Sequence, residues 1–526
     1  LILKSLIQMA VLKQINASLN DLKEQNNIRL NAEFNRLISD QLKDEPAPFI
    51  YERIGEKFRY YFIDEMQDTS ELQWQNLIPL IENSLTSETI DGQTGKLMLV
   101  GDAKQAIYRW RGGKAEQFIQ LTHKDEASVF PIEKEVKSLA FNYRSSSEIV
   151  QFNNAFFTHV SDFLKKDSYK QLYISGNNQK ISEKAGGYVQ VSFVDESETD
   201  DKELVYPKKV LEIINNLEAN TDLSDVCILV RTKKQGITIS KFLSENEVPI
   251  ISSETLLLKN NSLINFVIDV FSFINEGFNK EALANALCFL SNEYLKVENI
   301  HLFLSKRMNL SGQDLFDSLI EYNINFKLKE FVALPFYDAA EYLIRSFNLK
   351  EFDLVFMQSL LDIILEFNQK NNAGIAEFLE YWERKKDSFS VVMPEGQNAV
   401  QIMTIHKSKG LEFSVVIFPY DLNMYREINP KTWYANLNSE KFLGLESSLV
   451  DYSKKVKYTG DYGAQIYEEH QNELELDNLN LLYVALTRPI NQLYIITNTQ
   501  KTTKELEASK SYSDLFTDFL QNHIDK

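Results

Sequence analysis

The chain has 526 residues, a net charge of −19, 44% apolar residues and 25% charged residues. At about 150 residues per domain, this length predicts about three or four domains with ordinary globular cores. No apolar run is long enough to cross a bilayer, so we expect no membrane partner. The acidic balance argues against a protein that coats nucleic acid indiscriminately, although it leaves room for a local basic groove.

The cysteines and the first residues bear on the cellular compartment. Cys227 and Cys288 cannot form a zinc or iron–sulfur site without other ligands, and both lie in apolar runs typical of buried free thiols. The start of the chain lacks the basic region and the small-residue cleavage site of a signal peptide. We therefore expect a reduced, cytoplasmic protein. Because residue 1 is not Met, we also expect that the chain begins inside a longer reading frame.

The first part of the chain alternates between helical and strand patterns. Residues 1–45 carry apolar residues at helical spacing, and Pro46 and Pro48 end this pattern. Pro79 should kink or divide the helix that contains it. The predicted elements beyond the first helical segment are strands at 60–63 and 96–100 and a helix at 74–85. Strands that alternate with helices favour parallel α/β layers.

A long helical segment interrupts the strand pattern in the second part. From about residue 253 to residue 388 the strand signal disappears and Leu- and Phe-rich helical periodicity replaces it. The acidic run 195–203 reads as a solvated loop or helix start. Buried strands are predicted on both sides of the helical segment, at 226–230, 399–404, 415–418 and 493–496. This order predicts a helical domain inserted into an α/β domain.

The first motif with chemical meaning is Y-F-I-D-E-M-Q-D-T, from Tyr61 to Thr69. An apolar strand ends in the carboxylates of Asp64 and Glu65. Nucleotide hydrolases hold Mg²⁺ and a water in this way at the carboxyl end of a buried strand. Asp64 would hold Mg²⁺, and Glu65 would orient or deprotonate the attacking water. The alternative is a pair of strand-end acids that caps the next helix.

The second motif, V-G-D-A-K-Q-A-I-Y-R-W-R-G, runs from Val100 to Gly112. A strand would deliver Gln105 beside the carboxylates, where its amide could sense a γ-phosphate. Tyr108, Trp110 and Arg111 interleave rings with guanidinium groups, which suits single-stranded nucleic acid because bases stack on the rings and phosphates meet the cations. The alternative is a core Trp beside surface arginines.

Three further motifs complete the set: N-Y-R-S from Asn142, T-I-H-K-S-K-G-L-E-F from Thr404, and L-L-Y-V-A-L-T-R from Leu481. Arg144 and Arg488 each stand at the end of an element, where two arginines could converge on a γ-phosphate as arginine fingers do. For either arginine alone, a surface salt bridge is the alternative. For His406 alone, the alternative is a packed histidine.

In this order and spacing, the five motifs resemble motifs II to VI of the superfamily 1 DNA helicases of the UvrD/Rep type, over essentially the whole chain. The motifs G-D-A-K-Q-A-I-Y-R-W-R-G and T-I-H-K-S-K-G-L-E-F are similar to the recombination helicase–nuclease branch, RecB or AddA. Simple UvrD-type proteins more often carry S-A-K where this chain has K-S-K at residues 407–409.

The resemblance implies an ATP- and Mg²⁺-dependent motor and assigns its catalytic residues. Asp64 would be the Mg²⁺ ligand and Glu65 the catalytic carboxylate. Gln105 would couple the γ-phosphate to DNA, and Arg144 and Arg488 would be the arginine fingers.

The resemblance also implies two sets of binding residues. Tyr143 would stack on adenine, Glu412 would approach the ribose, and Gly410 would lie at the nucleotide. The implied DNA contacts are Tyr108, Trp110, Arg111, Thr404 and His406.

The implied fold is α/β, with two RecA-like parallel-sheet domains, the first incomplete, and helical insertion domains. The expected divisions are 1–45 (end of the first helical insertion), 46–140 (partial first RecA-like domain), 141–255 and 395–526 (second RecA-like domain), and 256–394 (inserted helical domain).

Some features depart from the family pattern. The phosphate-cradling loop G-x-x-x-x-G-K-[ST] occurs nowhere in the 526 residues, and we expect it upstream of Leu1. The segment from Gly92 to Lys96 lacks the required spacing and reads as a turn. Gly113 and Lys114 replace the usual Ala-Asp. Pro489 replaces the usual Ala after T-R, and we expect it to shift the start of a following helix.

The sequence therefore predicts a 3′→5′ ATP-dependent DNA helicase or translocase, part of a RecB/AddA-like exonuclease in double-strand break repair. Its expected partners are single-stranded and duplex DNA and a second helicase–nuclease subunit. The isolated chain is expected to be inactive because it lacks the phosphate loop. The alternative is a non-catalytic DNA-binding scaffold derived from a helicase.

Overall fold

The computed structural model describes residues 2–44, 58–88, 92–122, 129–176, 178–195, 202–252, 257–277, 279–349, 354–371, 374–391, 398–435, 437, 440–442, 444–499 and 511–523. The chain divides into two compact units, Leu1–Lys209 with Ile405–Lys526, and Val210–Thr404. Every predicted site residue except Thr404 belongs to the first unit.

A small parallel sheet in the first unit carries the carboxylate motif. Strands β1 (Tyr60–Ile63) and β2 (Lys96–Leu99) pair in parallel, with Ile63 opposite Leu99. Side chains of helices α4 (Glu71–Thr86) and α5 (Ala115–Thr122) pack with those of the two strands. A buried cluster fills the space between these elements: Met66, Trp74, Ile81, Leu85 and Phe130. Both predicted strands are confirmed, and they end directly before Asp64 and Val100.

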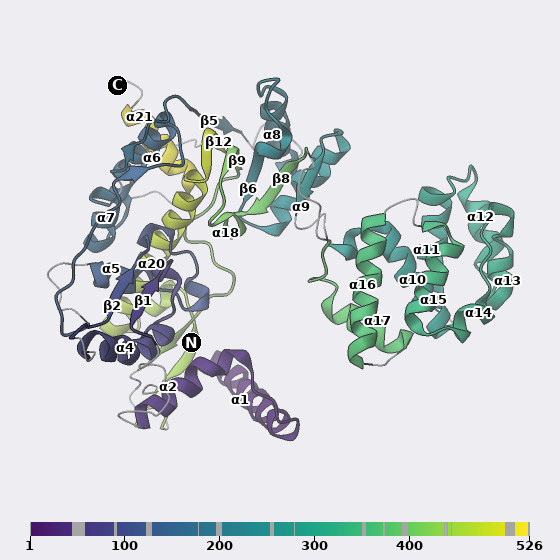
Figure 1. Ribbon diagram of the computed structural model, residues 1–526, viewed down its shortest axis with the longest axis horizontal. Helices are drawn as coiled ribbons and strands as arrows, with labels where there is room; N and C mark the ends of the chain where they lie inside the picture. The colour runs from purple at the N-terminus through teal and green to yellow at the C-terminus, as the bar shows by residue number, and fades with distance from the viewer. Residues whose placement is uncertain are drawn as a thin grey trace. The chain divides into compact units, whose positions relative to one another are not determined.

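A six-stranded sheet has the order β5-β12-β9-β6-β8-β7 (Figure 1). Strand β12 pairs in parallel with β5 and β9, and β8 pairs in parallel with β6 and β7. The strands are β5 (Tyr188–Val194), β6 (Val226–Val230), β7 (Ile250–Ser252), β8 (Val400–Thr404), β9 (Phe413–Pro419) and β12 (Pro489–Asn498). Parallel strands joined through helices confirm the predicted α/β class.

The remaining elements of this α/β fold are mostly helices. They are α6 (Ser147–Val160), α7 (Asp167–Ile174), α8 (Val205–Asn215), α9 (Lys233–Glu245), α18 (Ile405–Ser408), α20 (Asp461–Leu486) and α21 (Tyr512–His523), with short parallel strands β3 (Phe141–Asn142) and β4 (Lys180–Ile181). Pro489 opens strand β12, so the expected shift of a following helix is wrong. A proline needs no ladder N–H at the first residue of a strand, which explains its place there.

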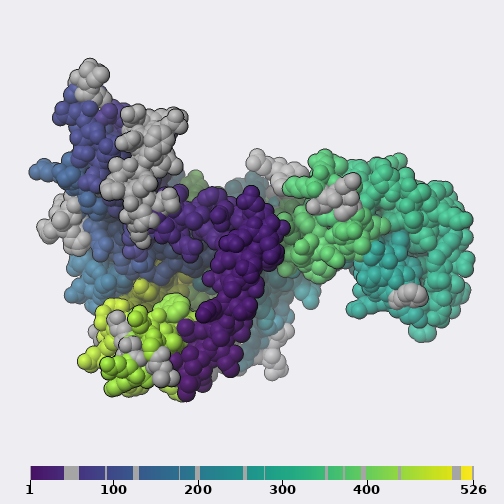
Figure 2. All heavy atoms as spheres, turned by 90° about the horizontal axis from the view of Figure 1, so that it is seen from below, coloured from purple at the N-terminus to yellow at the C-terminus, as the bar shows by residue number. Residues whose placement is uncertain are grey.

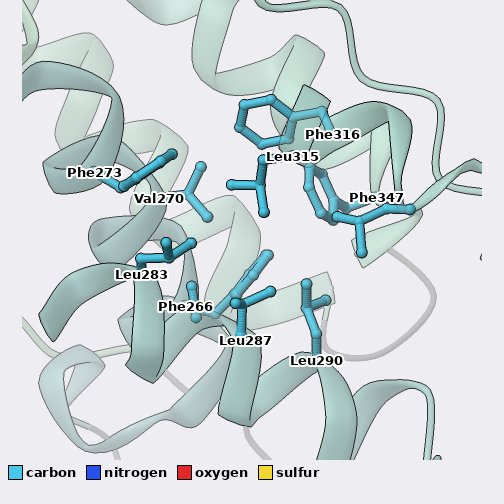
Figure 3. A pocket seen from close by; sticks show the side chains of 11 residues that line it. Phe266, Val270, Phe273, Leu283, Leu287, Leu290, Leu315, Phe316 and Phe347 are labelled. Atoms are coloured by element: carbon cyan, nitrogen blue, oxygen red, sulfur yellow. The ribbon is translucent and has the colours of Figure 1, made fainter. Parts of the chain in front are cut away.

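The predicted helical segment is confirmed within the described residues. It contains α10 (Ser262–Glu276), α11 (Lys280–Phe289), α12 (Ile300–Arg307), α13 (Gly312–Asp317), α14 (Leu328–Ala333), α15 (Phe336–Ser346), α16 (Leu354–Asn371) and α17 (Ile375–Lys385). Asn261 caps α10 through Leu263 N and Ile264 N, and Gly277 ends the helix in the left-handed conformation. The core of the whole helical segment is rich in Phe and Leu, and the small cavity inside this core has an entirely apolar lining (Figure 3).

The first helices pack against elements that are remote in the chain. Helix α1 (Ile2–Gln25) lies against the hairpin of β10 (Lys431–Tyr434) and β11 (Ser448–Asp451), as the purple and yellow-green atoms show (Figure 2). Lys431 Nζ donates to Gln8 Oε1 over 3.0 Å. Helix α2 (Phe34–Asp44) packs against α4, and the short helix α19 (Lys454–Lys457) packs against α20.

Some predictions fall on residues that the structure does not describe. Pro46 and Pro48, residues 196–201 of the acidic run, and the expected boundaries at 45/46, 255/256 and 394/395 lie outside the described residues. Among the helices that are described, none has the length and hydropathy of a transmembrane span.

Candidate functional site

Strand β1 presents the two motif carboxylates at its carboxyl end. Asp64 follows the last strand residue, and Glu65 comes next. Glu65 has a left-handed backbone (φ +52°), which is uncommon for a residue other than glycine. Its N–H donates to Asp64 Oδ1 over 2.8 Å, and the Gln67 amide donates to Glu65 Oε2. Met66 N donates to Val100 O over 3.0 Å, which ties the turn to the end of β2. The strained backbone therefore holds two exposed carboxylates in a defined position.

Lys409 joins the carboxylate motif to the loop that bears Gln105. Its side chain is only 7% exposed. Lys409 Nζ lies 2.6 Å from Asp68 Oδ2, 2.9 Å from Gln105 O and 3.3 Å from Glu65 Oε2. It also lies 5.5 Å from the centroid of the Tyr108 ring. Burial raises the pKa of Asp68, and the Lys409 ammonium partly offsets this effect.

A second connection runs from Gln67 to the turn after β2. Gln67 is buried, and its Oε1 accepts a hydrogen bond from Asp102 N over 3.0 Å. A Cβ at Gly101 would lie 2.4 Å from this same oxygen, so a larger residue there would displace the Gln67 amide. The Gln105 amide donates to Asp102 Oδ2 over 3.2 Å. The second motif thus lies beside the carboxylates, as its sequence position predicts.

Arg144 and Arg488 lie together with Glu412. Arg144 Nε donates to Glu412 Oε2 over 3.0 Å, and its Nη1 donates to Thr487 O over 3.3 Å. Arg488 is 1% exposed and donates to the carbonyl oxygens of Val484 and Leu411 over 2.9 and 3.2 Å. Burial and the nearby Arg144 guanidinium lower the pKa of Arg488 to about 10, so it stays charged at neutral pH.

The predicted nucleotide-binding residues near these arginines differ in exposure. Tyr143 is 74% exposed, and its ring centroid lies 6.1 Å from that of Phe141. Gly410 has a left-handed backbone (φ +84°) at the turn that separates Lys409 from Glu412. An exposed ring beside a cluster of arginines can stack on a planar base while the guanidinium groups meet phosphate.

Four of the five predicted DNA-contact residues gather on one surface. The Tyr108 ring centroid lies 6.2 Å from that of Trp110 and 5.8 Å from that of His406. Tyr108 Oη also donates to His406 O over 2.9 Å. The Arg111 guanidinium lies 4.5 Å from the centroid of Trp110, which is 68% exposed. Thr404 is the last residue of β8, opposite Val230.

Arg109 lies between Tyr108 and Trp110 in the chain but faces the protein. Its Nε lies 2.7 Å from Asp477 Oδ2, and its Nη atoms lie 2.9 Å from Glu116 Oε1 and 3.4 Å from Glu473 Oε1. Burial raises the pKa of Asp477 to about 6; Arg109 opposes this rise, while Glu116 and Glu473 add to it. Three carboxylates therefore share one guanidinium where α20 meets this loop.

Sequence reasoning missed the roles of several residues that the structure brings into the site. Lys409, Gln67 and Arg109 all stand inside the quoted motifs. The contacts of Lys409 and Gln67 reach other motifs, whereas those of Arg109 reach carboxylates of α5 and α20. Lys409 and Asp68 are separated by 341 positions in the chain. The only sequence signal for these three residues is their position within a motif. Such a position suggests a functional role but does not identify the residue's contacts.

The residues present fit a magnesium nucleotide. Mg²⁺ prefers carboxylate oxygen and keeps several waters, so one or two carboxylates plus phosphate oxygens suffice. Asp64 supplies such oxygens at the strand end. Buried Asp68 Oδ1 has no hydrogen-bond partner among the described residues. No group of three or more His, Cys, Asp or Glu suited to a metal occurs in the described part of the chain.

Comparison with known proteins places the chain among helicases. The model of the UvrD/REP helicase N-terminal domain matches residues 5–126. The model of the UvrD-like helicase C-terminal domain matches residues 137–333 and 341–500.

Individual relatives share one name, which describes them as a component of an ATP-dependent helicase/nuclease. The protein from Streptococcus pneumoniae (strain Hungary19A-6) is 24% identical over 543 residues, covering 89% of this chain and 42% of the relative. The protein from Lactococcus lactis subsp. lactis (strain IL1403) is 25% identical, covering 88% and 42%. The chain thus spans less than half the length of these curated relatives. Because the C-terminal family model alone covers more than half of the chain, and the N-terminal model covers most of the rest, the chain belongs to the UvrD-like helicase family.

Proposed function

We propose that the protein is an ATP-dependent DNA helicase or translocase with 3′→5′ polarity. The observation that carries the proposal is the Lys409 contact network. A single ammonium group touches Glu65, Asp68 and the backbone of Gln105, and it lies under Tyr108. The carboxylates suited to ATP hydrolysis and the rings suited to base stacking thus share one buried cation.

The roles of the catalytic residues follow from their chemistry. Asp64 would hold Mg²⁺, which neutralises phosphate charge when bound. Glu65 would accept a proton from, or orient, the attacking water, a contribution of about 10²–10⁴-fold in rate. Gln105 would meet the γ-phosphate with its amide. Arg144 and Arg488 would stabilise the charge that develops on the transferred phosphoryl group, worth about 10³–10⁵-fold per arginine finger.

The nucleotide and DNA surfaces complete the proposal. Tyr143 would stack on adenine, and Glu412, with Gly410 beside it, would approach the ribose. On the DNA surface, each base stacked on a ring contributes about 1–3 kcal/mol. The proposed single-strand contacts are Tyr108, Trp110, Arg111, Thr404 and His406.

The larger protein would be a helicase–nuclease in double-strand break repair and recombination. The shared name of the similar proteins supports this proposal. Its partners would be single-stranded and duplex DNA and a second helicase–nuclease subunit, and it would act in the cytoplasm. We also propose the division into two RecA-like domains with helical insertions at the boundaries predicted from the sequence.

The test compares DNA-stimulated ATPase of the full reading frame with that of Glu65→Gln. We expect Glu65→Gln to lower the rate by about 10²-fold or more while single-stranded DNA binding persists. Glu71→Gln is the matched control, because Glu71 is an exposed carboxylate, paired with Lys114, on the helix that follows the motif. Equal activity of Glu65→Gln and the wild type would refute the role of Glu65. DNA binding without any ATPase in the wild type would favour the scaffold alternative.

A separate prediction concerns ATP binding and turnover by the 526 residues in isolation. A phosphate loop anchors the triphosphate through backbone N–H groups and a lysine, and the sequence contains no such motif. We expect weak nucleotide binding and no ATP turnover above background for these residues in isolation. A steady-state phosphate-release assay measures this directly, and robust turnover would contradict it.

A further inference from the structure

Asn480 is a buried residue of α20 that holds the loop bearing Gln105. Its side chain is fully buried. The Asn480 amide donates one hydrogen bond to Ala103 O over 2.9 Å and the other to Ala106 O over 3.0 Å. Its Oδ1 accepts a hydrogen bond from Tyr173 Oη over 2.6 Å. The amide thus uses both donor hydrogens on the two carbonyl oxygens that flank Lys104 and Gln105.

The same helix holds the other end of this loop. Positions 473, 477 and 480 are spaced by four and three residues, so they lie on one face of α20. Glu473 and Asp477 bind Arg109. Residues 103–109 are therefore fixed to α20 at both ends. This segment contains Gln105 and Tyr108, one on the proposed nucleotide side and one on the proposed DNA side.

Helix α20 also leads to the buried arginine. It ends at Leu486, and Arg488 follows two residues later with its Nε bonded to Val484 O within the last turn. Between Asn480 and Arg488, Tyr483 lies 5.2 Å from Lys104 Nζ, measured to its ring centroid. Lys104 is itself buried and paired with Asp102 over 2.8 Å. A displacement of the loop would therefore act on the helix that positions Arg488.

We propose that Asn480 is a positioning residue that couples DNA contact to ATP hydrolysis, an inference that rests on the proposed function. DNA held by Tyr108 and Trp110 would fix the loop, and the Asn480 amide would transmit that position to α20 and Arg488. Without the amide, residues 103–106 would no longer be held in a fixed position against α20. DNA would still reach the rings, but it would no longer accelerate hydrolysis.

The experiment measures the ratio of kcat at saturating oligo(dT) to kcat without DNA, in the full reading frame. Asn480→Leu keeps a similar volume but removes both donors. Asn478→Leu is the matched control: Asn478 is on the same helix and its amide also donates to two carbonyl oxygens, those of Met424 and Leu474, neither in the loop. Tyr173→Phe removes the bond to Asn480 Oδ1 and leaves both loop contacts in place.

We expect the stimulation ratio to fall at least tenfold in Asn480→Leu and less than threefold in Asn478→Leu and Tyr173→Phe. A ratio in Asn480→Leu equal to that of Asn478→Leu would overturn the inference. Asn480→Ala replaces Asn480→Leu if the latter does not fold. If both fail to fold while Asn478→Leu folds, Asn480 serves stability and the inference is overturned. A wild type without DNA stimulation would instead refute the proposed function.

Discussion

Glu65 adopts a left-handed backbone at the position where the sequence predicts a catalytic carboxylate. Such backbone strain is typical of functional sites, because surrounding contacts must compensate for it. The sequence predicts Asp64, Glu65 and Gln105 as site residues from strand ends and motif spacing, and the structure places all three beyond the ends of β1 and β2. It could not identify the partner of Lys409, because no local rule links a lysine to a carboxylate 341 positions away. Residue types were therefore predictable at this site, whereas the connections between motifs were not.

Removal of the Lys409 ammonium should destabilise the protein. Lys409→Met leaves Asp68 and the Gln105 carbonyl without their buried cation, and we expect a loss of about 2–3 kcal/mol in the free energy of unfolding. Lys114→Met is the control, because the Lys114–Glu71 pair is about half exposed on both sides and should contribute less than about 1 kcal/mol. Urea unfolding monitored by circular dichroism measures both. Equal losses in the two variants would contradict the buried role of Lys409.

At the scale of elements, apolar runs predicted the positions of the strands well, whereas prolines were weaker predictors of helix ends. Strands β1 and β6 coincide with their predicted ranges because each is a short apolar run. The sequence predicts that Pro79 kinks or divides its helix; α4 runs continuously from Glu71 to Thr86 through Pro79, so the helix is not divided. Buried Trp74, Ile81 and Leu85 on both sides of the proline hold the helix together. Tertiary packing therefore keeps α4 continuous at Pro79, and such packing cannot be read from a local sequence pattern.

Helix α20 carries a carboxyl whose titration should appear in stability measurements. The pKa of Asp477 is raised to about 6, above the value of about 4 expected in the unfolded chain. The folded state therefore binds the proton more tightly. The stability that Asp477 contributes is present at low pH and is lost as the pH rises from about 4 to about 6.

We expect the free energy of unfolding of the wild type, minus that of Asp477→Asn, to fall by at most about 3 kcal/mol over this pH range. Urea titrations of both proteins at several pH values between 4 and 7 measure this difference. A difference that stays constant or increases with pH would contradict the raised pKa.

At the scale of the whole molecule, the acidic chain confines its proposed DNA surface to a small region. A net charge of −19 argues against general attraction to DNA, so the proposed binding rests on local contacts such as Trp110 stacked with Arg111. The sequence predicted the α/β class and the inserted helices, because periodicity changes clearly along the chain. It could not predict the clamp between α20 and residues 103–109, because that clamp joins segments remote in sequence.

A DNA motor driven by this site should separate duplex strands, which can be measured with the full reading frame. The substrates are fluorescently labelled duplexes with a 3′ or a 5′ single-stranded tail, each measured with and without ATP and with Glu65→Gln as the inactive control. We predict ATP-dependent separation of the 3′-tailed duplex by the wild type and none by Glu65→Gln. Failure of the wild type to separate the 3′-tailed duplex with ATP would contradict the proposed motor. Equal separation by Glu65→Gln would contradict the role of Glu65.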